Sequence, residues 1–158
     1  SRIYYYYYYL TLNFFLWLLR KALNFKKNPY HPMVWINGDP VIGKNVYISG
    51  FVEIYAKGAK VIIGDNCDIG SFTVINCADS HLKTIEKSGF VARKSITIEH
   101  NVFMGSHVMV KGETTIGHHS VLAAGTVVGG INIPPYSLVY GNPAKVKEGY
   151  YYSKTYST

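Results

Sequence analysis

The stretch ITIEHNVFMGSHVMVKGETTIGHHSVLAAGTVV, residues 96–128, carries an aliphatic side chain at every sixth position. The same spacing begins at residue 36, skips three residues before residue 63, and is interrupted for longer before residue 98. The aliphatic positions are Ile36, Ile42, Ile48, Ile54, Ile63, Ile69, Ile75, Ile98, Met104, Val110, Ile116, Leu122 and Val128. The residue that follows is often glycine, which suits a coil corner that requires a positive φ angle.

A period of six excludes a helix, whose faces recur every 3.6 residues, and is a multiple of the strand period of two. A short strand and a turn, repeated every six residues, return the same side chain to the interior each time. Three such units close a triangular coil of about eighteen residues, and stacked coils pair their backbones in parallel. The sequence therefore predicts an all-β fold, a parallel β-helix with coils at residues 42–59, 63–80, 98–115 and 116–133. The period does not set the hand of the coil.

Two segments without the period divide the chain. Residues 78–95 carry several charges and a glycine, which predicts a loop extruded from a coil corner, and long loops in compact domains are usually functional. Residues 134–158 begin with two prolines and are predicted to form a cap and tail over the open end of the stack. Residues 1–35 form an N-terminal helical segment, which leaves residues 36–133 for the β-helix.

The N-terminal segment is aromatic and basic, with six consecutive tyrosines at residues 4–9. The apolar stretch 10–25 is interrupted by asparagine, arginine and lysine, so a membrane-spanning helix is not expected, and the features of a secretory signal are missing. Two roles stay open. The helix packs its apolar face on its own or a neighbouring subunit, or it is an interfacial anchor with Trp17 at headgroup level and basic residues near lipid phosphates. We expect a cytoplasmic protein, located at the inner face of a membrane in the second case.

Composition narrows the class of partner. The 158 residues include 16 Lys and Arg against 9 Asp and Glu, a net charge of +7, and 48% are hydrophobic, which excludes a disordered or acidic chain. Two cysteines are too few for a disulfide scaffold and indicate a reducing compartment. The basic residues are scattered and no nucleic-acid-binding motif accompanies them. A phosphorylated ligand therefore explains the charge better than nucleic acid does.

The extruded loop also carries a candidate catalytic pair. His81 lies on this loop, and Asp79 stands two residues before it as an orienting carboxylate. An imidazole is suited to proton abstraction at neutral pH. A cysteine nucleophile is a weaker candidate, because Cys67 falls on an inward position and Cys77, near the start of the loop, has no base placed beside it.

Residues 96–128, together with IPPYSLVYGNPAKV at 133–146, resemble the hexapeptide-repeat acyltransferases. Within that superfamily they are most similar to the sugar O- and N-acetyltransferases, and the resemblance covers roughly residues 36–148. It implies a left-handed parallel β-helix, a homotrimer, and acetyl-CoA bound between neighbouring coil stacks. It also implies transfer of the acetyl group to a hydroxyl or amine of a sugar, nucleotide-sugar or surface-glycan acceptor.

The resemblance further implies roles for individual residues. The loop histidine, His81, acts as general base, a backbone N–H at Gly105 or Ser106 holds the oxyanion, and the coenzyme passes an alanine-glycine rung toward a lysine in the tail. The candidate oxyanion and coenzyme residues are Gly105, Ser106, Lys111, Ala123, Ala124, Gly125 and Lys145. Lys111 departs from the family pattern, which commonly has a small residue at that position.

Two other function classes stay open. The first is a non-catalytic β-helix that scaffolds an assembly, with or without a membrane. The second, less favoured, is a metalloenzyme similar to the γ-class carbonic anhydrases, which share the coil and bind zinc through histidines from two subunits. Such a site needs two histidines five residues apart, and no pair among residues 81, 100, 107, 118 and 119 has this spacing. We therefore expect no metal.

Overall fold

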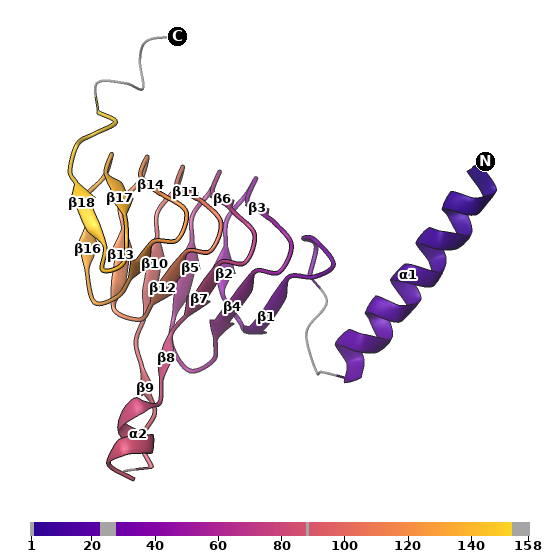
Figure 1. The fold of residues 1–158 in the computed structure, drawn as a ribbon, viewed down its shortest axis with the longest axis horizontal. Coiled ribbons are helices and arrows are strands. Elements are labelled where there is room, and N and C mark those ends of the chain that lie inside the picture. The colour runs from indigo at the N-terminus through magenta and orange to yellow at the C-terminus, as the bar shows by residue number, and fades with distance from the viewer. Residues whose placement is uncertain (1, 23–27, 88, 153–158) are drawn as a thin grey trace.

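The computed structural model describes residues 2–22, 28–87 and 89–152. These residues form a stack of parallel β-coils, an N-terminal helix that extends away from one end of the stack, and a hairpin that projects from its side (Figure 1). The all-β parallel β-helix predicted from the six-residue period is confirmed.

Three sheets form the sides of the coil, with five, five and six strands. The first contains β1 (Trp35–Gly38), β4 (Glu53–Ala56), β7 (Val74–Asn76), β12 (Met109–Lys111) and β15 (Val127–Val128). The second contains β2 (Val41–Ile42), β5 (Val61–Ile63), β10 (Ile96–Ile98), β13 (Thr114–Ile116) and β16 (Asn132–Ile133). The third contains β3 (Tyr47–Ile48), β6 (Asp68–Ile69), β11 (Phe103–Met104), β14 (Val121–Leu122), β17 (Leu138–Tyr140) and β18 (Lys145–Lys147).

The core is a set of aliphatic columns along the axis of the stack. In the first sheet Ile36 pairs in register with Ile54, and Ile54 pairs with Ile75. The column continues through Val110 to Val128. From Ile54 onward these side chains are at most 1% exposed, so the periodic residues are the core that the sequence pattern predicts.

The stack extends further than the sequence pattern indicated. After Val128 the spacing shortens to five residues at Ile133 and then returns to six at Val139, and both side chains are fully buried. β17 pairs in parallel with β14, and β18 then pairs antiparallel with β17 at the end of the sheet. Because this corner is one residue shorter than in a regular repeat, the six-residue spacing does not predict the last part of the stack.

The corners are occupied by residues that the glycine pattern did not identify. Left-handed φ angles between 53° and 62° occur at Asn45, Asn66, Asn101, His119 and Tyr136 along one corner, and at Phe51, Phe72 and His107 along another. The glycines that follow the aliphatic positions have ordinary φ angles. They are needed because neighbouring coils approach closely: a Cβ atom on Gly105 would lie 2.6 Å from the backbone nitrogen of Ala124.

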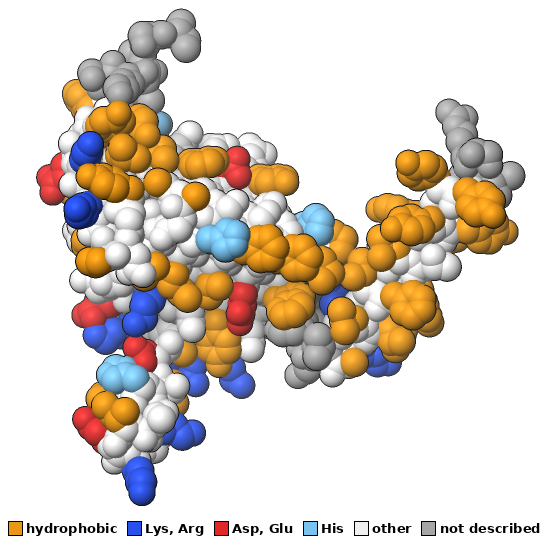
Figure 2. Space-filling view, viewed as in Figure 1, with side chains coloured by type: hydrophobic (Ala, Val, Ile, Leu, Met, Phe, Trp, Pro, Cys, Tyr) orange, Lys and Arg blue, Asp and Glu red, His pale blue; other side chains and the backbone are white. Residues whose placement is uncertain are grey.

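The N-terminal helix α1 (Arg2–Ala22) includes the tyrosine run and leaves its aromatic side chains exposed. Tyr4 is 83% exposed and Trp17 is 53% exposed, and hydrophobic side chains cover the helix surface in Figure 2. Among the described residues, no helix is long and apolar enough to cross a bilayer. Residues 23–27 lie outside the described part of the chain, and the two roles considered for this segment stay predictions.

The extruded loop is confirmed and has local structure of its own. β8 (Ala78–Asp79) pairs antiparallel with β9 (Ala92–Arg93), and the short helix α2 (His81–Ile85) lies between them at the tip (Figure 1). The antiparallel pair gives the loop a defined direction away from the stack, so a side chain near its base keeps a constant position relative to the coils.

Three histidines meet at the first corner. The rings of His100 and His118 stack with centroids 4.8 Å apart, and His119 stacks on Tyr136. Burial lowers the pKa of His119 from its ordinary value, and the positive charges that His118 and His100 acquire on protonation lower it further. The folded protein therefore resists protonation at this corner.

This depressed pKa predicts a loss of stability in mild acid. Because the folded-state pKa of His119 lies below the unfolded value of about 6.5, the unfolded chain binds the extra proton and the free energy of unfolding falls as the pH drops below about 6.5. His119→Asn should reduce this slope, since asparagine occupies the same corner at Asn66 and Asn101. Urea unfolding between pH 5 and 7.5 measures the effect. The same substitution at His107, away from the cluster, is the control, and an unchanged slope in His119→Asn would contradict the prediction.

Candidate active site

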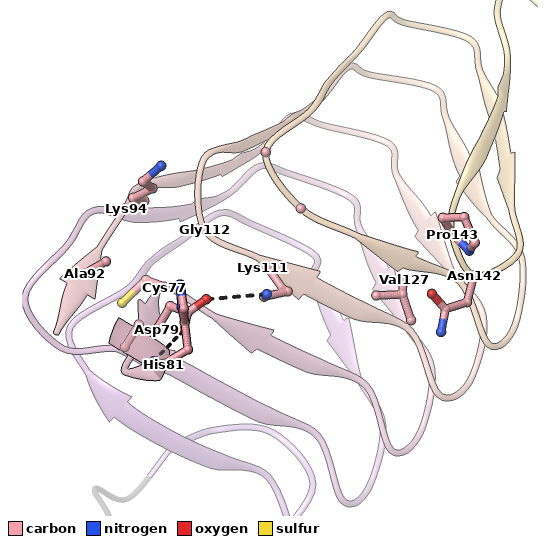
Figure 3. Close-up of a pocket in the computed structure, with 13 residues that line it drawn as sticks. Cys77, Asp79, His81, Ala92, Lys94, Lys111, Gly112, Val127, Asn142 and Pro143 are labelled. Atoms are coloured by element: carbon pink, nitrogen blue, oxygen red, sulfur yellow. Dashed lines mark hydrogen bonds and ion pairs between the residues drawn. The ribbon is translucent and has the colours of Figure 1, made fainter. Parts of the chain in front are cut away.

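A pocket of about 380 Å³ lies between the base of the extruded hairpin and the two successive coils that carry β12 and β15 (Figure 3). His81, Asp79 and Cys77 line it from the hairpin side, and Lys111 lies on the wall formed by the coils. The turn at Asn142 and Pro143, part of the GNPA motif, closes the far side. The pocket therefore combines residues of the hairpin, of two successive coils and of the GNPA turn, which are far apart in the sequence.

Asp79 and His81 form a hydrogen-bonded pair at this pocket. Oδ1 of Asp79 lies 2.6 Å from Nδ1 of His81 and accepts the backbone N–H of the same residue at 3.0 Å. Ser80 precedes α2 without a side-chain cap, so the Asp79 carboxylate is the group that binds the first N–H of the helix. The two-residue spacing thus positions the imidazole through the backbone and the ring together.

Electrostatics determine which ring nitrogen carries the proton. The backbone N–H of His81, its ring and the charge of Lys111 lower the pKa of Asp79 to about 2. The carboxylate is therefore ionised at neutral pH and only accepts hydrogen bonds. Nδ1 of the neutral His81 ring must then carry the hydrogen, which leaves the lone pair on Nε2. The predicted pair is in place, with the tautomer of a general base.

Two lysines complete the charged part of the pocket. Nζ of Lys111 lies 3.5 Å from Oδ2 of Asp79, and Lys94 forms an ion pair with Glu113. Lys111 was expected among the oxyanion and coenzyme residues, and the structure places it beside the Asp79–His81 pair. Lys94 has no motif around it, and no signal in the sequence could have identified it as a residue of the pocket.

The remaining candidate residues lie elsewhere on the chain. The pocket does not include Gly105, Ser106, Ala123, Ala124, Gly125 or Lys145. The N–H of Gly105 donates to the carbonyl of Leu122 at 2.8 Å, so it is not available for an oxyanion. No hydrogen bond within the described residues uses the N–H of Ser106. In a single chain, the oxyanion and coenzyme candidates other than Lys111 therefore lie apart from the pocket of the candidate base.

Cys77 lines the pocket but is not an activated nucleophile. Its side chain is 2% exposed, burial raises the pKa of its thiol, and Sγ lies 3.7 Å from the carbonyl of Lys57. Because the thiolate is the nucleophilic form, the buried neutral thiol argues against an acyl-enzyme. Cys67 belongs to the core, as its inward position predicted.

Comparison with known proteins gives concordant results. Residues 95–129 match the family described as the hexapeptide repeat of succinyl-transferase. The galactoside O-acetyltransferase of Escherichia coli strain K12 is 33% identical over 122 residues, which is 73% of this chain and 59% of the relative. The structure of a hexapeptide-repeat-containing acetyltransferase from Vibrio cholerae is 31% identical, with a TM-score of 0.62, over 77% of this chain and 68% of that one.

The chain belongs to the hexapeptide-repeat acetyltransferase family. The V. cholerae acetyltransferase has also been solved with acetyl coenzyme A, with a TM-score of 0.62 and 34% identity over 68% of this chain and 58% of that one. A galactoside acetyltransferase in complex with coenzyme A matches with a TM-score of 0.63 and 29% identity over 80% of this chain and 67% of that one. The left-handed parallel β-helix implied by the sequence resemblance is the fold of this acetyltransferase family.

Two further facts limit what family membership implies. This hexapeptide-repeat chain spans 52–59% of the length of the first curated relatives that it matches. Within the part of the chain that the structure describes, no three or more His, Cys, Asp or Glu side chains are grouped so that they could hold a metal ion.

Proposed function

We propose that this protein is an acetyl-CoA-dependent acetyltransferase that acetylates a hydroxyl or an amine of a sugar at the pocket of His81. The observation that carries the proposal is the Asp79–His81 pair, which presents an unprotonated Nε2 at a pocket of a hexapeptide-repeat stack. The relatives support the substrate classes, since one is a galactoside O-acetyltransferase and another was solved with acetyl coenzyme A.

The reaction is a direct transfer in one addition and one elimination. The acceptor hydroxyl or amine attacks the thioester carbonyl carbon while Nε2 of His81 takes its proton. The tetrahedral oxyanion then collapses, the bond between carbon and sulfur breaks, and the thiolate of coenzyme A leaves and takes the proton from His81. Asp79 holds the imidazolium that exists between these steps, because its carboxylate stays ionised across the assay range.

The oxyanion and coenzyme residues enter through a second copy of the chain. We propose a homotrimer in which acetyl-CoA lies between neighbouring stacks, with its pantetheine along the rung at 123–125 and its phosphates near Lys145. The N–H of Ser106 then holds the oxyanion, a contribution of about 3 kcal/mol per donor in comparable sites. The separation of these residues from His81 within one chain supports a site shared between subunits.

Further observations bear on the class of acceptor, the location of the protein and the role of α1. A sugar, nucleotide-sugar or surface glycan acceptor is proposed from the galactoside-modifying relatives. Two reduced cysteines and the use of acetyl-CoA support a cytoplasmic location. The exposed aromatic side chains of α1 support contact of this helix with a neighbouring subunit.

The test of the proposed function is a thiol-release assay with acetyl-CoA across galactosides, amino-sugars and nucleotide-sugars. Release of coenzyme A that depends on one acceptor, together with the mass of the acetylated product, supports the enzyme. Binding of neither acetyl-CoA nor any acceptor supports the alternative of a non-catalytic scaffold.

Removing the base or its partner should abolish turnover without unfolding the protein. His81→Ala should lower kcat by about 10²- to 10⁴-fold, the usual contribution of a general base, and Asp79→Asn should also lower it strongly because an amide that donates to Nδ1 leaves the proton on Nε2. Thermal stability should change little, because the His81 side chain is 59% exposed. Initial rates and melting curves measure both effects. A His81→Ala variant with more than about a tenth of the wild-type kcat would exclude His81 as the base.

Lys145 should contact the phosphates of the coenzyme. Lys145 is exposed on β18 beside the GNPA turn. Lys145→Ala should raise the KM for acetyl-CoA several-fold, because one charge-assisted contact to a phosphate is lost, and should change the KM for the acceptor less. Acetyl-dephospho-CoA, which lacks the 3′-phosphate, is the control substrate and should reduce the difference between the two proteins. Equal KM values for acetyl-CoA would place Lys145 outside the site.

The assembly should be a trimer of the 17.8 kDa chain. Phe103 is 46% exposed and Met109 is half-buried on the sides of the stack, and a flat apolar side is a suitable surface for packing between subunits. Phe103→Asp should therefore weaken association and lower activity together. Light scattering at micromolar concentration measures the mass, and an active, stable monomer would contradict the shared site.

A further inference from the structure

We propose that Lys111 is a positioning residue, which holds the Asp79 carboxylate in the orientation in which it hydrogen-bonds to His81. This inference rests on the proposed function, because it concerns the base of that reaction. It differs from a role in binding the oxyanion or the coenzyme, and the two roles predict different measurements.

The two oxygens of Asp79 have separate partners. Oδ1 lies 2.6 Å from Nδ1 of His81 and accepts the backbone N–H of His81 at 3.0 Å. Oδ2 lies 3.5 Å from Nζ of Lys111. His81 contacts its partner from the same hairpin, whereas Lys111 extends from β12 on the stack (Figure 3). Lys111 is therefore the charged contact that connects the catalytic pair of the hairpin to the rigid coils.

The neighbouring coil leaves space for the Lys111 side chain at Gly129. A Cβ atom at Gly129 would lie 2.9 Å from Cβ of Lys111 and within 3.5 Å of its Cγ and Cδ. The φ angle of Gly129 is not left-handed, so the backbone does not require glycine there. The absence of a side chain at position 129 leaves room for the stem of Lys111, which then reaches the pocket on the side of Asp79.

Among the described residues that line the pocket, Lys111 is the cation that forms an ion pair with Asp79. Lys94 is paired with Glu113, and the guanidinium of Arg93 donates to the carbonyl of Lys57. Cys77 is a buried neutral thiol. Lys83 follows His81 by two residues on the exposed surface of α2. The ammonium group of Lys111 and the ring of His81 contact the same carboxylate, so removing the ammonium group leaves His81 as the partner of Asp79.

Removing this charge should move the titration of the His81 ring. In Lys111→Met, which keeps the stem over Gly129 and removes the charge, the ring should titrate at a pH about 0.2–0.7 unit higher than in the wild type, the range expected for one exposed ion pair. Lys111→Arg should restore the wild-type curve. Lys94→Met makes the same change in net charge at the other lysine of the pocket and should leave the His81 curve where it is.

The measurement is a pH titration of the ring by ¹H–¹³C correlation spectra of the whole chain, with the His81 signal assigned from its loss in His81→Ala. This readout requires no turnover, so it separates failure of the inference from failure of the proposed function. Coincident His81 curves in the wild type and Lys111→Met would overturn the positioning role. A shift of equal size in Lys94→Met would also overturn it, because the effect would then be nonspecific.

Kinetics distinguish positioning from binding. At a pH below the midpoint of the His81 titration, Lys111→Met should lower kcat by about 1.6- to 5-fold, which is the expected titration shift converted to a rate. The kcat values of the wild type and Lys111→Met should become equal at high pH. The KM for acetyl-CoA should be unchanged, and the effect should disappear in a His81→Ala background, since the two residues act as a unit. A raised KM for acetyl-CoA with an unchanged kcat profile would instead assign Lys111 to the coenzyme and overturn the proposal.

Discussion

The parallel stacking of inward aliphatic side chains is the constraint on which the rest of the structure depends. Each inward residue contacts its equivalent in the next coil, as Ile54 does with Ile75, so an insertion inside a strand would displace every later side chain from the core. Extra chain can leave only at a corner. The hairpin leaves after Cys77, whose N–H still bonds to Tyr55, and the coil resumes at Ile96, whose N–H bonds to Lys60. The core thus determines where the catalytic pair can be attached.

The same constraint explains how much of the fold could be predicted from the sequence. The aliphatic period identifies the coils because it repeats a side-chain contact that the coils share. The end of the stack was missed because one residue is absent before Ile133, and a corner tolerates a length change that the period does not. The glycines were assigned to the corners, yet close coil-to-coil contact requires them, as the short approach at Gly105 shows. A sequence pattern does not distinguish a φ requirement from a space requirement.

The candidate site could be predicted only where its contacts are local. His81 and Asp79 are two residues apart, so a loop of any shape can bring them together. The contact between Lys111 and Asp79 joins the stack to the hairpin, and Gly129 leaves room for the Lys111 side chain that makes it. The residues next to Lys111 and Asp79 in the sequence do not indicate this contact. Lys94 reaches the pocket because the second strand of the hairpin returns beside Cys77, with its N–H on the Cys77 carbonyl at 2.9 Å. Contacts between the hairpin and the stack depend on how the hairpin returns to the coils. The six-residue period predicts the coils and not the path of the hairpin.

The exposure of the candidate pair, Asp79 and His81, bears on the proposed assembly. The side chain of His81 is 59% exposed and that of Asp79 is 36% exposed in the single chain, where water weakens the interaction between their charges. A general base acts better once water is excluded, because the carboxylate then stabilises the imidazolium more strongly. In the proposed trimer, the neighbouring stack and the coenzyme cover this hairpin and supply the oxyanion donor in the same step. In this proposal the single chain orients the candidate base, and full activity requires the surface that a second copy provides.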